Sequence, residues 1–93
     1  MEHVRSIKVL YIIVNAGFAD DVIALAREAG ARGATILNAR GESGRHELFI
    51  GITVDTEKEL IICVTDEHTA KRVMAVVKQK AGIETPAHGI CFM

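Results

Sequence analysis

The chain has 93 residues, of which 49% are hydrophobic and 25% charged, and its formal net charge is −1 at pH 7. These values are typical of one folded domain and argue against a disordered chain. The charge lacks the cationic excess that nucleic-acid binding requires, and the longest apolar run, Val9–Val14, is far shorter than the roughly 20 residues of a membrane-spanning helix. We therefore expect no nucleic-acid partner and no membrane insertion and, because residues 1–8 lack a signal-peptide pattern, a cytoplasmic location.

The first half of the chain predicts a strand, a helix and a second strand. Residues 7–14 (IKVLYIIV) are apolar on both alternating faces, which predicts a strand buried on both sides. The apolar spacing from Phe18 to Ala29, with acidic residues in the first turn and Gly30 after the last, predicts a helix. Residues 34–41 (ATILNARG) then predict the second strand.

The second half predicts a third strand at residues 59–64 (ELIICV), again apolar on both faces. Thr65 or Asp66 is the expected N-cap of a second helix, whose apolar stripe stops at Gly82. Residues 89–93 (GICFM) predict a fourth strand. The order β-α-β-β-α-β over residues 1–93 predicts a single α+β domain of the ferredoxin-like kind, a four-stranded antiparallel sheet with two helices on one face.

Two helices on one face leave the other face of this sheet without cover. Because residues 7–14 and 59–64 are apolar on both sides, the uncovered face would be a contiguous apolar surface, which is unusual on a monomer. We expect another copy of the chain to cover it. The alternative is a solvated face with scattered apolar residues.

The sequence contains no nucleophile elbow, no Walker loop, and no HExxH or paired CxxC motif. We therefore expect no enzymatic activity and no metal site. His46 and His88 lie beside glycine or proline in predicted loops, where ligand contacts concentrate. Gly41 and Gly89 lie at predicted strand ends, where backbone N–H groups can approach a phosphate, although an ordinary turn role stays open for both.

Four segments resemble, in their order and spacing, the P-II family of signal-transduction proteins: residues 20–22 (DDV), 30–41 (GARGATILNARG), 44–51 (GRHELFIG) and 87–93 (AHGICFM). That family consists of ferredoxin-like trimers that bind adenine nucleotides in clefts between subunits. The resemblance covers nearly the whole chain. It implies a homotrimeric, nonenzymatic regulator that senses a small ligand and controls a partner protein such as a transporter or an enzyme.

The GRHELFIG stretch resembles the T-loop of this family, a protruding segment that docks on partner proteins. The resemblance places a T-loop-like segment at about residues 42–55. The residues expected to contact the partner are Arg45, His46, Glu47, Leu48 and Phe49.

The resemblance also implies nucleotide contacts on the second strand, the third strand and a glycine-containing B-loop that wraps the phosphates. The matching residues are Thr35, Gly41, Cys63 (through its backbone), Ala87, His88 and Gly89. Ile90 stands where that loop carries a phosphate-binding lysine, and the arginines that follow in the family have no counterpart here. We therefore expect AMP or ADP to bind in preference to ATP, with no required cofactor.

Two other classes share this order of elements. A metal-binding trimer of the CutA type would use Cys63, Cys91 and histidines. The placement of the cysteines in predicted strands argues against these side chains converging on one metal ion. An ACT-like amino-acid-binding module would give no reason for the GRHELFIG stretch. Both alternatives stay open from the sequence.

Overall fold

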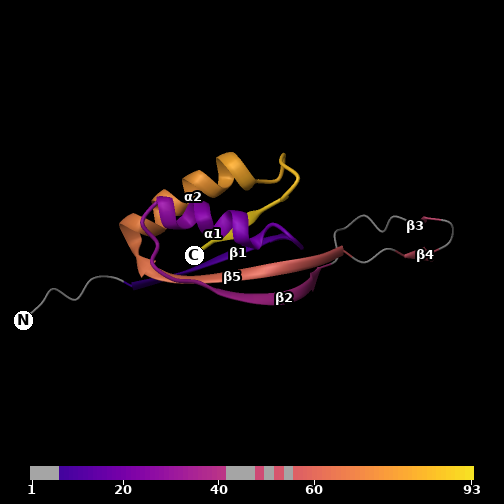
Figure 1. The fold of residues 1–93 in the computed structure, drawn as a ribbon, viewed down its shortest axis with the longest axis horizontal. Coiled ribbons are helices and arrows are strands. Elements are labelled where there is room, and N and C mark those ends of the chain that lie inside the picture. Colours follow the sequence, from indigo (N-terminus) through magenta and orange to yellow (C-terminus); the bar gives the residue numbers. More distant parts are fainter. Residues whose placement is uncertain (1–6, 42–47, 50–51, 54–55) are drawn as a thin grey trace, which may run out of the picture.

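The computed structural model describes residues 7–41, 48–49, 52–53 and 56–93. Four strands form an antiparallel sheet in the order β2-β5-β1-β6 (Figure 1). Both helices lie on one face of this sheet. The strands and helices are β1 (Ile7–Asn15), α1 (Ala19–Glu28), β2 (Thr35–Gly41), β5 (Thr56–Asp66), α2 (Glu67–Ala81) and β6 (Ile90–Phe92). The ferredoxin-like fold predicted from the sequence is therefore confirmed.

A small hairpin lies within the segment that was expected to be T-loop-like. Its strands are β3 (Leu48–Phe49) and β4 (Ile52–Thr53), which pair with one another and not with the main sheet. The sequence had predicted no strand there. Three residues of the expected partner-binding loop, Arg45, His46 and Glu47, lie outside the described residues.

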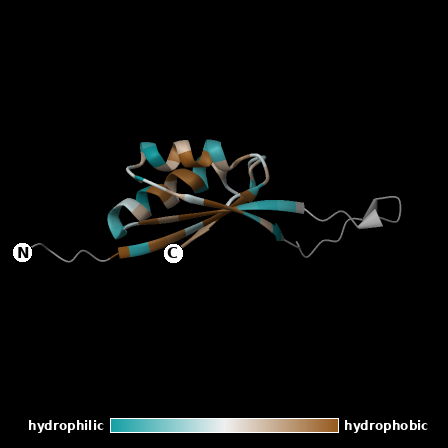
Figure 2. Ribbon diagram, turned by 60° about the horizontal axis from the view of Figure 1, so that its bottom comes forward, coloured by the Kyte–Doolittle hydropathy of each residue, from teal (hydrophilic) through white to brown (hydrophobic). Residues whose placement is uncertain are grey.

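The core lies between the sheet and the two helices. Leu10 and Ile12 of β1 pair with Cys63 and Ile61 of β5, and all four side chains are fully buried on the helix-facing side. The apolar stripes of α1 and α2 pack against them. Figure 2 shows that the strands are hydrophobic beneath the helices and become hydrophilic toward the end where β5 begins.

The helix boundaries follow local chemistry that the sequence partly predicted. Asp66 is the N-cap of α2, where its side chain accepts a hydrogen bond from the N–H of Thr69 at 2.7 Å. Gly30, after α1, has a φ of 112°, which explains the glycine there. Gly82 ends α2 for a different reason: a Cβ at this position would lie 2.4 Å from the carbonyl oxygen of Lys78.

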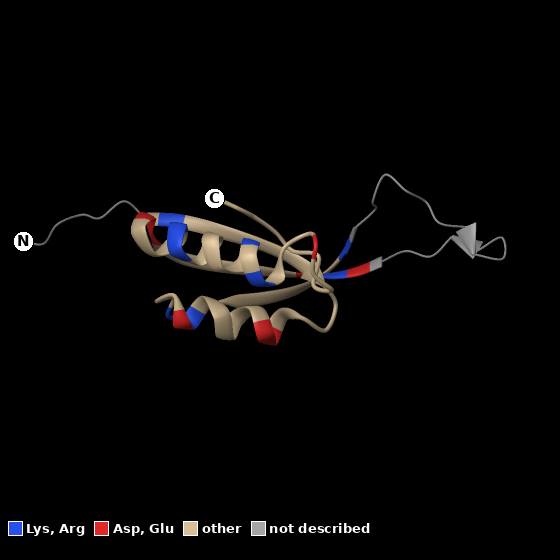
Figure 3. Ribbon diagram, turned by 90° about the horizontal axis from the view of Figure 1, so that it is seen from above, with Lys and Arg blue, Asp and Glu red and all other residues tan. Residues whose placement is uncertain are grey.

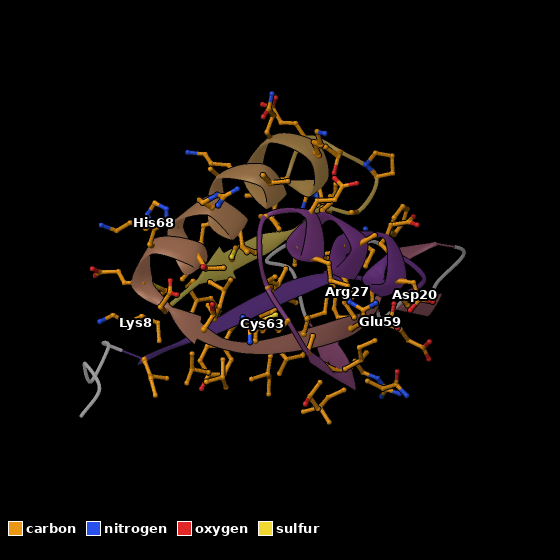
Figure 4. All side chains as sticks on the ribbon, turned by 60° about the vertical axis from the view of Figure 1, so that its left-hand side comes forward. Lys8, Asp20, Arg27, Glu59, Cys63 and His68 are labelled. Carbon is orange, nitrogen blue, oxygen red and sulfur yellow. The ribbon has the colours of Figure 1, made fainter. Side chains whose placement is uncertain are left out.

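The opposite face of the sheet is apolar, as predicted, and no element among the described residues covers it. Large apolar side chains of all four strands lie on or beside this face (Figure 4), several of them strongly exposed. Those of β1 and β5 pair across the strands as Val9 with Val64, Tyr11 with Ile62, and Ile13 with Leu60. Neither described helix has the length and apolar sequence needed to cross a membrane.

Candidate functional site

The candidate site lies at one end of the main sheet, which we call the loop end. Here β1 ends at Asn15, β2 ends at Gly41, and β5 begins at Thr56, which pairs with Gly41. The β1–α1 turn and the loop at residues 82–89 lie at this end too. Backbone N–H groups of residues 15 and 16 donate hydrogen bonds to this loop and to β5, respectively. Figure 3 shows charged positions of β2 and β5 near this end.

The loop at residues 82–89 is fixed largely by its own backbone. The N–H of His88 donates to the carbonyl of Thr85 at 3.0 Å, and the N–H of Gly89 donates to the carbonyl of Ala81 at 2.7 Å. A Cβ on Gly89 would lie 2.3 Å from that Ala81 oxygen, so only glycine permits this approach. Because the Gly89 N–H is already engaged, this glycine serves close packing, and the bare N–H expected at this strand end is not free.

His88 adopts a left-handed backbone conformation with φ 51°, which is uncommon for a residue other than glycine. Its side chain is exposed, whereas Ala87 is 4% exposed and packs in the core. Of the three residues expected in the B-loop, His88 is therefore the one whose side chain faces solvent.

Asn15 joins β5 to this loop, and nothing in the sequence pattern had singled it out. Its backbone N–H donates to the carbonyl of Ala87 at 2.9 Å, and its side-chain Nδ2 donates to the carbonyl of Pro86 at 3.0 Å. Its Oδ1 accepts a hydrogen bond from Nζ of Lys58 at 2.6 Å. Only the strand register, which places Lys58 opposite Asn15, could have pointed to this contact.

Glu59 of β5 holds the start of α1. Its Oε1 accepts hydrogen bonds from the N–H of Gly17 at 2.6 Å and from the N–H of Ala19 at 3.2 Å. Phe18, the N-cap residue, provides no side-chain cap, so the carboxylate that satisfies this helix terminus comes from the sheet (Figure 4). This is a second side-chain contact at the loop end that the sequence pattern did not predict.

Two hollows flank these contacts. A groove of about 780 Å³ runs between α2, the 82–89 loop and β6, and its wall includes Lys78, Ile83, Thr85, Ile90 and Cys91. A polar hollow of about 530 Å³ at the base of the 42–55 segment is lined by Ala16, Gly17, Asn38, Ala39, Arg40, Glu57, Lys58 and Glu59. The second hollow carries both signs of charge, so it is not a simple anion site.

The residues expected to contact a nucleotide fall into two separate groups. Thr35 pairs with Ile62, so it lies beside the backbone of Cys63. The others are at the loop end, where Gly41 lies on the β2 edge of the sheet and Ala87, His88 and Gly89 precede β6 at the opposite edge. Since Thr35 and Gly41 are the two ends of a 7-residue strand, they lie about 20 Å apart, and one protomer does not bring the two groups together.

The two cysteines are free thiols on either side of β1. Two strand spacings separate their backbones by about 10 Å, too far for a disulfide. Burial, followed by the proximity of Cys63, raises the pKa of Cys91 to about 11, and burial raises the pKa of Cys63. In the described part of the chain no group of three or more His, Cys, Asp or Glu side chains could hold a metal ion.

The fold is that of a ferredoxin-like α+β domain. The family model described as nitrogen regulatory protein P-II matches residues 7–93. The chain therefore belongs to the P-II family of signalling proteins. Comparison with curated proteins finds no match.

Solved structures of P-II-like proteins share this fold. A PII-like signalling protein from Thermus thermophilus has a TM-score of 0.70 and 19% identity, with 92% of this chain and 82% of that chain covered. CPII from Thiomonas intermedia, bound to ADP, AMP and acetate, has a TM-score of 0.68 and 21% identity, with coverage of 92% and 81%. CPII bound to ADP, AMP and bicarbonate has a TM-score of 0.66 and 19% identity, with coverage of 94% and 89%.

Proposed function

We propose that this protein is a homotrimeric, nonenzymatic regulator that binds an adenine nucleotide in clefts between subunits. It acts in the cytoplasm and controls a transporter or an enzyme through the T-loop-like segment at residues 42–55. The observation that carries this proposal is the division of the expected nucleotide contacts into two groups at different ends of one sheet.

A site shared between subunits accounts for this division. The Thr35 and Cys63 group of one protomer would face the Ala87–Gly89 group of its neighbour, so that each cleft is complete only in the assembly. The nucleotide would then bind the assembled form better than the isolated chain and would stabilise the assembly by mass action.

The helix-free face of the sheet supports the trimer. Ile7 is 71% exposed, Val64 is 63% exposed and Phe92 is 46% exposed in the isolated chain. Burying a large apolar side chain contributes about 1.5–3 kcal/mol. A face with this many exposed apolar side chains is therefore an efficient interface between copies.

The ligand we propose is AMP or ADP in preference to ATP. CPII, which has the same fold, is bound to ADP and AMP in its structures. Ile90, at the position of the family's phosphate-binding lysine, is 49% exposed and offers no charge to a phosphate. Loss of a charged contact costs about 2–5 kcal/mol, and the loss matters most for the ligand with the most phosphate groups.

Regulation would act through a shift in population. A ligand that makes different contacts in two arrangements of the loop end shifts the equilibrium between them by its difference in affinity. The partner would then bind the arrangement that the ligand favours. Leu48 and Phe49 supply apolar groups that a groove on the partner could bury.

A thermal-shift screen of the whole chain tests the class of ligand. AMP, ADP, ATP, divalent metals and amino acids are added separately, each at several concentrations. A rise in melting temperature with AMP or ADP supports the proposal. A rise with metals alone would favour the CutA-type alternative, and a rise with amino acids alone would favour the ACT-like module.

A further inference from the structure

We propose that Asn15 is a positioning residue that couples residues 57–59 of β5 to the loop at residues 86–89. The strand at 57–59 directly follows the T-loop-like segment, and the loop is the one expected to hold the phosphates. The inference rests on the proposed function for the ligand, whereas the link itself is made by contacts within one chain.

The link uses both polar atoms of the Asn15 side chain. Nζ of Lys58 is a donor only, and the carbonyl of Pro86 is an acceptor only. An amide satisfies both at once, by accepting from Lys58 at 2.6 Å and donating to Pro86 at 3.0 Å. The contact with Lys58 therefore fixes the orientation of the amide that holds the loop.

Other side chains could not make the same link. Aspartate at position 15 would still accept from Lys58, but it would present an oxygen to the Pro86 carbonyl, which repels it. An apolar side chain would lose both contacts. Asn15→Asp thus removes the side-chain contact with Pro86 and keeps both the contact with Lys58 and the hydrogen bond from the backbone N–H of residue 15 to the Ala87 carbonyl.

Further hydrogen bonds attach the β1–α1 turn to β5. The N–H of Ala16 donates to the carbonyl of Glu57 at 3.1 Å, and Gly17 and Ala19 donate to the carboxylate of Glu59. The turn is thereby held on one side by residues 57–59, while Asn15, at its start, holds the loop on the other side. A displacement of β5 at this point reaches the loop through Asn15.

Such coupling is reciprocal. If the arrangement of residues 57–59 changes the affinity of the loop for a ligand, binding of the ligand changes the equilibrium between the arrangements of residues 57–59 by the same free energy. Ligand binding at the loop would thereby affect the start of β5, which follows the T-loop-like segment. The contacts of Asn15 would thus connect the proposed ligand site to this segment.

Hydrogen–deuterium exchange of the full chain tests the link, first without ligand. We expect Asn15→Asp to speed amide exchange at residues 85–89 at least fivefold, while exchange within β1 and α2 stays unchanged. Asn38→Asp makes the same chemical change on β2, which lies on the other side of β5 from β1, and is the control. Equal loop exchange in the two variants would overturn the proposal, and selective acceleration in Asn15→Asp supports it.

The second measurement adds ADP at saturation for each variant. In the wild type, ADP should slow exchange at residues 56–59, and Asn15→Asp should abolish this slowing although ADP still binds. Lys58→Met should weaken the slowing, and the double variant should match Asn15→Asp, because both residues lie on one path. Persistence of the full slowing in Asn15→Asp would overturn the proposal.

A failure of the proposed function would look different. If ADP and AMP do not bind the wild type, the ligand assignment is wrong, but the ligand-free comparison of Asn15→Asp with Asn38→Asp still decides whether Asn15 positions the loop.

Discussion

Tyr11 and Phe92 stack ring against ring on the helix-free face of the sheet, with centroids 5.2 Å apart and planes inclined by 17°. They come from β1 and β6, which pair in this register. An aromatic pair of this kind gains stability beyond its buried area, yet Phe92 remains 46% exposed in the isolated chain. The stack therefore lies on the face that we propose a second copy covers.

Ile62→Glu should dissociate the trimer and leave the protomer folded. Ile62 pairs with Tyr11 and Thr35 on the helix-free face and is only half-buried, so a carboxylate there can stay hydrated in a monomer but not in an interface. Light scattering measures the mass, and circular dichroism checks the fold.

The matched control is Ile61→Glu, one residue away on the opposite face. Ile61 is fully buried beneath the helices, so a charge there should unfold the protomer. If both variants unfold, or if the wild type itself is a monomer at micromolar concentration, the interface is wrong.

Glu59→Ala should lower the free energy of unfolding by about 0.5–2 kcal/mol, the range found for loss of a helix N-cap. The reason is that the N–H groups of Gly17 and Ala19 lose their acceptor. Glu57→Ala is the control, since Glu57 contacts the turn through its carbonyl and that contact survives. Urea denaturation of both variants is the measurement, and equal losses would show that Glu59 acts only through its charge.

Most of the helices and strands could be predicted from the sequence because their apolar residues recur with the simple periods of a helix or a strand. The stripe from Ala70 to Ala81 predicted α2, and the apolar residues of 7–14 and 59–64 predicted the two central strands. The third strand proved longer, Thr56–Asp66, because its polar first residues pair with β2 and carry no apolar signal. The β3–β4 hairpin was missed because two-residue strands have no period to detect.

The thiols give a prediction in alkaline solution. The pKa of Cys91 is raised from an ordinary 9.0 to about 11, so the unfolded chain releases this proton first as the pH rises. The contribution of Cys91 to stability is therefore complete below pH 9 and declines as the pH rises toward 11. Cys91→Ala should flatten the decline of unfolding free energy in this window, measured by urea denaturation at successive pH values.

The same shift predicts slow alkylation. At pH 8, iodoacetamide should modify Cys91 about tenfold more slowly than an unfolded cysteine, because fewer thiolates outweigh their greater nucleophilicity. Cys63, which is fully buried, should react only on unfolding. Mass spectrometry measures the rate of modification. Rapid modification of Cys91 in the folded protein would contradict its burial.

Phe49→Ala should leave the fold and the trimer intact and weaken partner binding at least tenfold, a loss of about 1.4 kcal/mol. Phe49 belongs to β3, which pairs only with β4 and adds no strand to the main sheet. A pull-down identifies the partner, and melting temperature and affinity are then measured on the same variant. A large fall in melting temperature would show that Phe49 stabilises the fold and has no docking role.

The candidate site was less predictable than the fold, because its contacts join residues far apart in the chain. Asn15 meets Pro86 across 71 positions, and Glu59 meets Gly17 across 42. No local motif marks either pair. Gly89 was expected to present a bare N–H at a strand end, but this N–H donates a hydrogen bond to the carbonyl of Ala81, and close packing explains the glycine.

A calorimetric titration of ADP into the wild-type protein and into the Ile62→Glu variant tests the proposed shared cleft most directly. We expect one nucleotide bound per chain of the wild type, weaker binding of ATP under the same conditions, and no measurable binding to a folded Ile62→Glu monomer, because each cleft needs residues of two subunits. Absence of ADP and AMP binding to the wild type, or equal ADP affinity for the wild type and the monomeric variant, would contradict the proposed site.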